Sequence, residues 1–187
     1  MIKLNILTTN QGKAKEFIEL GKELNVEVNI INQYKMEIQS ERLEDIALTA
    51  AILASTQLKN HVIVEDAGLF INSLRGFPGV YSSYVFKTIG IKGILKLLEN
   101  VKDRSAYFKS VIAFADMGRG IIKVFTGITE GHIAYEPRGT SGFGFDPIFI
   151  PKGYNKTFAE MSIKEKNKVS HRAKAFRKLV EWFKTSF

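Results

Sequence analysis

Residues 2–17 read IKLNILTTNQGKAKEF and indicate the class of fold. The apolar run at residues 2–8 is typical of a buried β-strand. The polar turn Asn10-Gln11-Gly12 ends this strand, and apolar residues recur at helical spacing from Lys13 to about Leu24. A strand, a short glycine-containing turn and a helix together form the opening of an α/β unit.

The rest of the chain continues this alternation and adds an antiparallel part. Apolar and β-branched runs predict strands at 26–31, 62–64, 68–74, 106–115, 121–135 and 145–150, and helical spacing predicts helices at 43–58, 91–98 and from 162 onward. The turn at 117–120 makes the two longest strands a hairpin. Together these elements predict an α/β protein with a mixed sheet, flanking helices and a second lobe built on the hairpin.

The composition excludes several kinds of chemistry. The chain has 187 residues and no cysteine, which excludes disulfides, thiolate nucleophiles and zinc–thiolate sites. Its three histidines are scattered, so a bound metal would depend on carboxylates, which favour Mg²⁺ or Mn²⁺. No apolar run approaches the roughly 20 residues needed to cross a bilayer, and the N-terminus does not resemble a secretory signal. We therefore expect a cytoplasmic protein without membrane contact.

The charge balance indicates an anionic partner. Lysine and arginine number 27 against 19 aspartates and glutamates, a net charge of +8. Such an excess attracts nucleic acid, nucleotides or acidic membrane surfaces, and it does not distinguish among them.

The turn at residues 8–13 is the first candidate for chemistry. Where a strand feeds a helix, backbone N–H groups and the positive end of the helix dipole meet at one point, which suits a phosphate. Lys13 lies in the first helical turn, where a cation is disfavoured unless an anion is near. An ordinary solvated lysine is the alternative, and the glycine spacing is not that of a Walker A loop.

A carboxylate pair, Glu65 and Asp66, directly follows the short apolar strand at 62–64. The carboxyl end of a central strand is where α/β folds bind ligands, and adjacent side chains of an extended chain point to opposite faces. Glu41, before the second helix, could complete a carboxylate cluster. In the alternative interpretation, Glu65 and Asp66 cap a turn and Glu41 is solvated.

Two further segments combine charge, aromatic residues and glycine. Ser170 fits a helix N-cap, which places His171 and Arg172 at the helix end that disfavours cations. Gly142 and Gly144 alternate with Phe143 and Phe145, which would let the backbone approach a flat ligand beside an aromatic face. For residues 170–172 the alternatives are a solvated basic helix face and, for His171, a buried structural histidine. For residues 142–145 the alternative is a strand that is interrupted by glycines.

Three stretches make the chain resemble the inosine triphosphate pyrophosphatase family. They are TTNQGKAKEF at 8–17, VEDAGLFINSLRGFPGVYS at 64–82 and GFGFDPIFIPKGYNKTFAEMSIKEKNKVSHRAKAFRKL at 142–179. They run in the family's order over essentially the whole chain. The resemblance implies one domain, residues 1–187, with an elongated two-lobed α/β fold, a central cleft and usually a homodimer.

The resemblance also implies roles for individual residues. Asp66 matches the catalytic acidic residue, which also sits at the metal and is expected to act as general base, and Glu41 matches a second metal carboxylate; Glu65 is a further candidate ligand. Lys13 is expected to assist catalysis by neutralising the triphosphate. The remaining matches to the phosphate loop and to substrate contacts are Thr8, Thr9, Asn10, Gln11, Gly12, Ala67, Phe143, Gly144, Phe145, Asp146, Lys166, His171 and Arg172.

Three positions depart from the family's pattern. Thr9 replaces a usual glycine, Ala67 replaces a serine or threonine, and helix 43–58 lacks a lysine that many members carry. These departures can change substrate affinity, because they remove backbone freedom, a hydroxyl and a positive charge.

The implied activity is Mg²⁺-dependent hydrolysis of non-standard purine nucleoside triphosphates (ITP, dITP or XTP) to the monophosphate and pyrophosphate. The alternatives are a pyrophosphatase for other modified nucleotides and a basic nucleic-acid-binding module without catalysis. The acidic residues Glu41, Glu65 and Asp66 argue against the binding module, since without a metal they would repel a phosphate backbone. We therefore expect no stable nucleic-acid complex.

Overall fold

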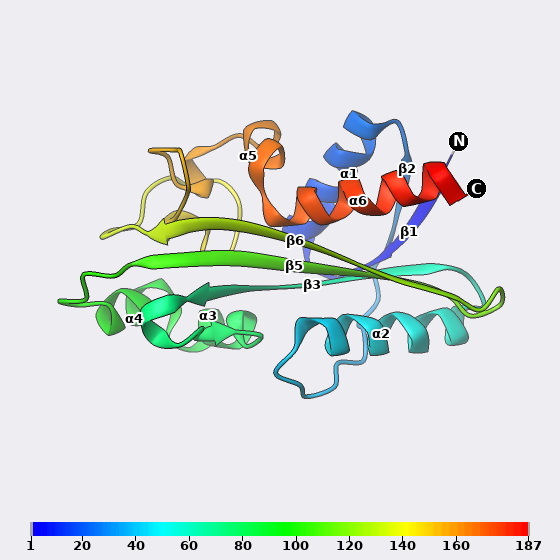
Figure 1. Ribbon diagram of the computed structural model, residues 1–187, viewed down its shortest axis with the longest axis horizontal. Helices are drawn as coiled ribbons and strands as arrows, with labels where there is room; N and C mark the ends of the chain where they lie inside the picture. Colours follow the sequence, from blue (N-terminus) through cyan, green and yellow to red (C-terminus); the bar gives the residue numbers. More distant parts are fainter. Residues whose placement is uncertain (1, 187) are drawn as a thin grey trace.

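The computed structural model describes residues 2–186 as a seven-stranded mixed sheet with helices on both faces (Figure 1). The strand order is β2-β1-β3-β5-β6-β7, and the short β4 pairs with β3 alone. The strands are β1 (Lys3–Leu7), β2 (Glu27–Ile31), β3 (Val62–Ile71), β4 (Pro78–Gly79), β5 (Ser105–Asp116), β6 (Ile121–Ile133) and β7 (Phe149–Pro151).

The central strand β3 joins the parallel and the antiparallel parts of the sheet. Its first residues pair in parallel with β1, where Leu7 lies opposite Val64. β1 ends there, and β3 continues to Ile71 along the antiparallel β5. Polar side chains after Val64 therefore lie where the short N-terminal strands stop and the long strands go on.

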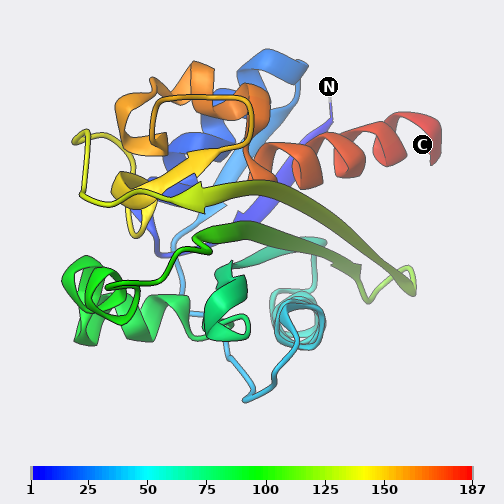
Figure 2. The same cartoon turned by 60° about the vertical axis from the view of Figure 1, so that its left-hand side comes forward.

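Helices cover the two faces of the sheet in separate groups (Figures 1 and 2). One face carries α1 (Gln11–Leu24), α5 (Ile163–Val169) and α6 (His171–Ser186), and the other carries α2 (Leu43–Leu58), α3 (Ser82–Thr88) and α4 (Gly90–Leu97). One apolar cluster packs α1 and α6 on the sheet, a second lies beneath α2, and a third fills the end with α3 and α4.

The fold class predicted from the sequence is confirmed, while three local predictions differ. The predicted strands at 62–64 and 68–74 are joined in one strand that ends at Ile71, because pairing with β5 overrides the low strand preference of Asp66 and Gly68, and Asn72–Leu74 form a 3₁₀ turn. Residues 146–148 form a 3₁₀ turn that delays β7 to Phe149–Pro151, and α3 was not predicted. The hairpin strands belong to the common sheet, and the division into two lobes stays a prediction.

Gly127 on β6 allows α6 to lie close against the sheet. A Cβ atom at this position would come within 2.0 Å of the His171 carbonyl oxygen and 2.6 Å of the Ala175 nitrogen. Lys174 and Lys178 of α6 also donate hydrogen bonds of 2.8 Å to carbonyls of β6. The contact fixes the start of α6, which carries the predicted substrate residues His171 and Arg172.

We expect Gly127→Ala to lower the free energy of unfolding by about 1–3 kcal/mol, because the added methyl group overpacks this contact. Gly118→Ala, in the hairpin turn, is the matched control, since its Cβ would meet no heavy atom closer than 3.5 Å. Urea unfolding of both variants measures the effect. Equal stability of the two variants would contradict the close packing of α6.

Candidate active site

The predicted phosphate loop lies between β1 and α1. The Asn10 side chain accepts a 3.0 Å hydrogen bond from the Lys13 backbone and caps α1, and the Thr8 hydroxyl accepts one of 3.1 Å from the Asn10 backbone. Thr9, Asn10 and Gln11 are exposed. The helix starts at Gln11, so the loop presents the positive end of the α1 dipole to solvent.

Gly12 brings this loop against the predicted aromatic residue. A Cβ atom on Gly12 would lie 2.2 Å from the Phe143 ring, so this position accepts no side chain while the ring stays in place. The half-buried Phe143 ring has the Lys166 ammonium 5.1 Å and the Arg172 guanidinium 5.4 Å from its centre. The structure thus unites the first and third sequence stretches in one site.

Six charged side chains of alternating sign lie beneath the Phe143 ring, and we call them the buried charge chain. Lys13 Nζ lies 2.7 Å from Glu65, and Glu65 lies 3.2 Å from Arg172. Arg172 also pairs with Glu16, which lies 2.7 Å from Lys166, and Lys166 lies 2.5 Å from Asp146. The members in order are Lys13, Glu65, Arg172, Glu16, Lys166 and Asp146.

The buried charge chain determines the protonation state of its own carboxyl groups. Burial disfavours the charged form of Glu65, but Arg172 and Lys13 outweigh it and hold the pKa of this carboxyl well below its usual range. The Ser110 hydroxyl adds a 2.7 Å hydrogen bond to Glu65. The pKa of Glu16 is lowered in the same way by Arg172 and Lys166. Both carboxyl groups are therefore ionised at neutral pH.

Internal carboxylates explain the cations at the starts of α1 and α6. The sequence favoured a bound anion, such as a phosphate, at these helix starts, whereas the structure pairs Lys13 with Glu65 and Arg172 with Glu65 and Glu16. Glu16 was missed from the sequence. The feature of the sequence that could have identified it is its position on the inward face of α1, next to Phe17 and one helical turn before Leu20.

Asp66 points to the opposite side of the sheet from Glu65, as the alternation predicted. In the β3–β5 register Glu65 lies opposite Ile112 and Asp66 opposite Val111. Glu65 meets α1 and α6, whereas Asp66 accepts a 3.3 Å hydrogen bond from Lys35 in the segment before α2. Both carboxylates lie inside the long β3 rather than at its end, although the parallel pairing stops just before them.

Burial raises the pKa of Asp66, and the nearby carboxylates of Glu65 and Glu37 add to this increase, whereas Lys35 and Lys13 act to lower it. Its side chain remains 16% exposed. A carboxylate with a raised pKa at a partly open position is suited to accept a proton.

The carboxylate associated with Asp66 is Glu37 rather than the predicted Glu41. Lys35 Nζ lies 2.9 Å from Glu37 and 3.3 Å from Asp66, so the two acids share one cation. Glu41 is exposed, and its role as a metal ligand stays a prediction. Among residues 2–186 no group of three or more His, Asp or Glu is arranged to hold a metal. Glu65, a further predicted ligand, is fully committed to the buried charge chain.

The remaining predicted substrate residues differ in exposure. Gly144 is half-buried with a φ of +61°, whereas the buried Phe145 belongs to the core, packs edge-to-face on Phe86 of α3 and supports the loop from below. Ala67 is half-buried opposite Ser110. His171 is buried and stacks on Phe108 at 4.6 Å, and burial lowers its pKa well below the usual value. Its Nδ1 has no hydrogen-bond partner among the described residues.

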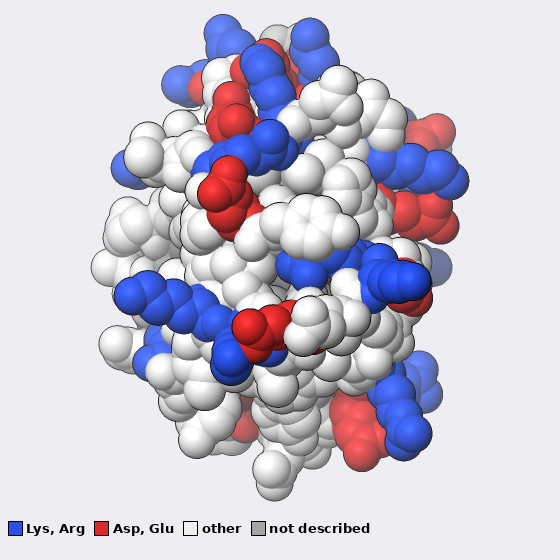
Figure 3. Space-filling view, turned by 90° about the vertical axis from the view of Figure 1, so that its left-hand side faces the viewer, with Lys and Arg blue, Asp and Glu red and all other residues white. Residues whose placement is uncertain are grey.

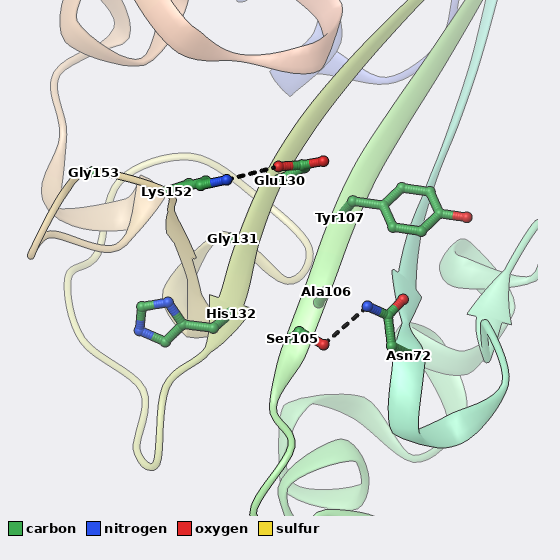
Figure 4. A pocket seen from close by; sticks show the side chains of 9 residues that line it. All are labelled: Asn72, Ser105, Ala106, Tyr107, Glu130, Gly131, His132, Lys152 and Gly153. Atoms are coloured by element: carbon green, nitrogen blue, oxygen red, sulfur yellow. Dashed lines mark hydrogen bonds and ion pairs between the residues drawn. The ribbon is translucent and has the colours of Figure 1, made fainter.

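A hollow of about 440 Å³ lies elsewhere, over the far ends of β5 and β6 (Figure 4). Four of its polar side chains pair with each other, Asn72 with Ser105 at 2.9 Å and Lys152 with Glu130 at 3.3 Å. It contains none of the predicted site residues. We therefore place the candidate active site around Lys13, Asp66 and Phe143.

The fold and the site define an α/β protein whose polar side chains meet at a central strand and suit an anionic, phosphate-containing ligand. The chain belongs to the Ham1 family, whose sequence model matches residues 4–182. This confirms the resemblance inferred from the three stretches of sequence.

Named relatives cover nearly the whole chain. The dITP/XTP pyrophosphatase of Hyperthermus butylicus is 57% identical over 96% of this chain and 93% of its own length, and that of Saccharolobus solfataricus is 52% identical over 98% and 95%. The Ham1 protein of Staphylococcus aureus superposes with a TM-score of 0.84 at 31% identity, covering 99% of this chain and 100% of that one. No helix within residues 2–186 is long and apolar enough to span a membrane.

We expect Glu16→Gln to lower the free energy of unfolding by about 3–5 kcal/mol, since it leaves Lys166 and Arg172 buried with too few anions. Glu19→Gln, one turn along α1, is the control; Glu19 makes only longer contacts to the exposed Lys22 and Lys164, and we expect a change within about 0.5 kcal/mol. Urea is the appropriate denaturant, because it does not screen charges. A small loss in Glu16→Gln would show that the charge chain does not stabilise the fold.

Proposed function

We propose that this chain hydrolyses non-standard purine nucleoside triphosphates, namely dITP, XTP and ITP, to the nucleoside monophosphate and pyrophosphate. The observation that carries the proposal is near full-length identity of 57% and 52% to two proteins named dITP/XTP pyrophosphatase. The partly exposed Asp66, which interacts electrostatically with Lys13 of α1, supplies the chemistry that such a reaction needs.

Mg²⁺ is the metal we propose, with Mn²⁺ as a substitute. Its oxygen preference matches carboxylates, and it is usually held by one or two of them together with waters and substrate phosphates. Asp66 and Glu37 fit this requirement, because a cation, the Lys35 ammonium, already lies between them. When bound, the metal supplies positive charge to the phosphates and acts as a Lewis acid.

The residues of the chain have separate roles in the proposed hydrolysis. Asp66 accepts the proton of a water whose oxygen attacks the α-phosphorus, and the bond from that phosphorus to the bridging oxygen breaks as pyrophosphate leaves. Lys13 and the exposed N–H groups at the start of α1 stabilise negative charge on the phosphates. Burial raises the pKa of Asp66 above its usual value, which makes its carboxylate a stronger proton acceptor.

Base selection follows from the aromatic and basic groups around Phe143. Its half-buried ring offers a stacking face beside Lys166 and Arg172. A 6-oxo group accepts hydrogen bonds from such donors, whereas the 6-amino group of adenine places donor against donor. Each polar group left unpaired in a buried site costs about 1–3 kcal/mol, which favours hypoxanthine and xanthine.

We also propose a cytoplasmic homodimer. Exposed apolar side chains on β6 (Ile122, Val124 and Ile128) and on α3 (Phe86) support an association surface. The cytoplasmic location follows from the nucleotide pool on which the enzyme acts. On the face shown in Figure 3, basic and acidic side chains are interspersed, in contrast to the continuous basic stripe typical of nucleic-acid-binding proteins.

We expect Asp66→Asn to reduce pyrophosphate release from dITP by about a hundred- to ten-thousand-fold, since the amide cannot accept the proton. Asp116→Asn, the same change at the far end of β5, is the control and keeps the wild-type rate. The assay measures pyrophosphate from dITP, XTP, dGTP and dATP with and without Mg²⁺. Full turnover by Asp66→Asn would refute the assignment of the base.

Two glutamine variants distinguish the candidates for the second metal carboxylate. We expect Glu37→Gln to raise the Mg²⁺ concentration for half-maximal turnover at least about tenfold, and Glu41→Gln to change it less than about twofold. The reason is that Glu37 shares a cation with Asp66, whereas Glu41 is exposed. The reverse result would assign the role to Glu41.

A further inference from the structure

Lys35 connects the segment between β2 and α2 to the centre of the candidate active site. Its Nζ atom lies 2.9 Å from Glu37 Oε1 and 3.3 Å from Asp66 Oδ1. The side chains of Lys35 and Asp66 are each 16% exposed, and that of Glu37 is 57% exposed. The ammonium therefore lies at a half-open position, in contact with both carboxylates proposed to bind the metal.

A lysine and a divalent cation cannot both occupy this position. The ammonium lies between the two carboxylates and contacts one oxygen of each. A Mg²⁺ ion bound to both carboxylates, at its usual distance of about 2.0–2.1 Å from oxygen, would need the same space. An ammonium held a few ångströms from a divalent ion would repel it strongly at this depth. Metal binding at Asp66 and Glu37 must therefore displace the ammonium.

The surroundings allow Lys35 to leave. Residues 32–42 form neither helix nor strand, and the neighbours of Lys35, Tyr34 and Met36, are exposed. The four-carbon stem of lysine has several rotatable bonds, so the ammonium can turn toward solvent without a change in the sheet. Asp66, in contrast, is fixed by the pairing of β3 with β5.

We propose that Lys35 is a built-in counter-ion that competes with the divalent cation for Asp66 and Glu37 and thereby sets the metal affinity of the site. This inference rests on the proposed function, because it requires a metal at Asp66. Without metal, the ammonium neutralises the two carboxylates. With metal, the ammonium is released and is free to pair with another anion, such as a phosphate of the incoming triphosphate.

The test is direct binding of Mn²⁺ without nucleotide, measured by electron paramagnetic resonance of the free ion. We expect Lys35→Met to bind Mn²⁺ about tenfold more tightly than the wild type. Lys35→Arg keeps the charge and should stay close to the wild-type affinity. Lys109→Met is the matched control, because Lys109 is 23% exposed and pairs with Glu44 on the same face of the sheet; we expect a change below about twofold.

The outcomes separate this inference from the proposed function. Unchanged or weaker binding in Lys35→Met, with binding still abolished by Asp66→Asn, would overturn the competition and leave the metal site intact. Binding that does not depend on Asp66 would instead remove the metal site, and the inference with it. Tighter binding in both Lys35→Met and Lys109→Met would show a general charge effect and would also overturn the competition.

A measurement on the wild-type protein keeps the proposal testable if Lys35→Met fails to fold. Added Mg²⁺ should shift the side-chain Cε–Hε resonance of Lys35, which is assigned by its loss in Lys35→Arg. The corresponding resonance of Lys109 should stay in place. A Lys35 resonance that does not move at saturating Mg²⁺ would show that the ammonium is not displaced.

Discussion

Charges buried away from water are tolerated only where opposite charges meet them at close range. The buried charge chain satisfies this condition with side chains from distant parts of the sequence. Lys13 and Glu16 come from the first helix, Glu65 from the central strand, and Lys166 and Arg172 from the last two helices. Removing one member leaves its neighbours unpaired. The buried charge chain is therefore complete only when α1, β3, α5 and α6 are all in their correct positions.

The alternation of side chains along β3 separates this structural role from the chemical one. Glu65 points toward α1 and α6, where Lys13, Arg172 and Ser110 surround it and hold it ionised. Asp66 points to the other face, where burial raises its pKa and the side chain remains partly open. Two adjacent carboxylates thus acquire opposite pKa shifts from their surroundings alone. Glu65 is suited to fix the fold, and Asp66 is suited to take part in proton transfer.

Local patterns in the sequence predicted much of the fold. The helix at 43–58, the capping box at Ser162 and the hairpin around 117–120 appear as expected, because apolar periodicity and turn residues determine them locally. The continuity of β3 and the role of Glu16 depend on partners far along the chain, such as β5 and Arg172, which no local pattern reveals. Glu37 was missed for the same reason: only the folded chain places it with Lys35 and Asp66.

The pairing inside the charge chain also explains why the site would need a metal. Its three cations, Lys13, Arg172 and Lys166, are matched by three carboxylates. The six residues of the buried charge chain together therefore offer little net positive charge to a triphosphate. The start of α1 contributes only about half a positive charge through its dipole. In the proposed reaction, the remaining negative charge of the substrate would be met by a divalent ion at Asp66 and by cations that are free to move. Lys35, once released from Asp66 and Glu37, is such a cation, and metal binding and phosphate binding would then reinforce each other.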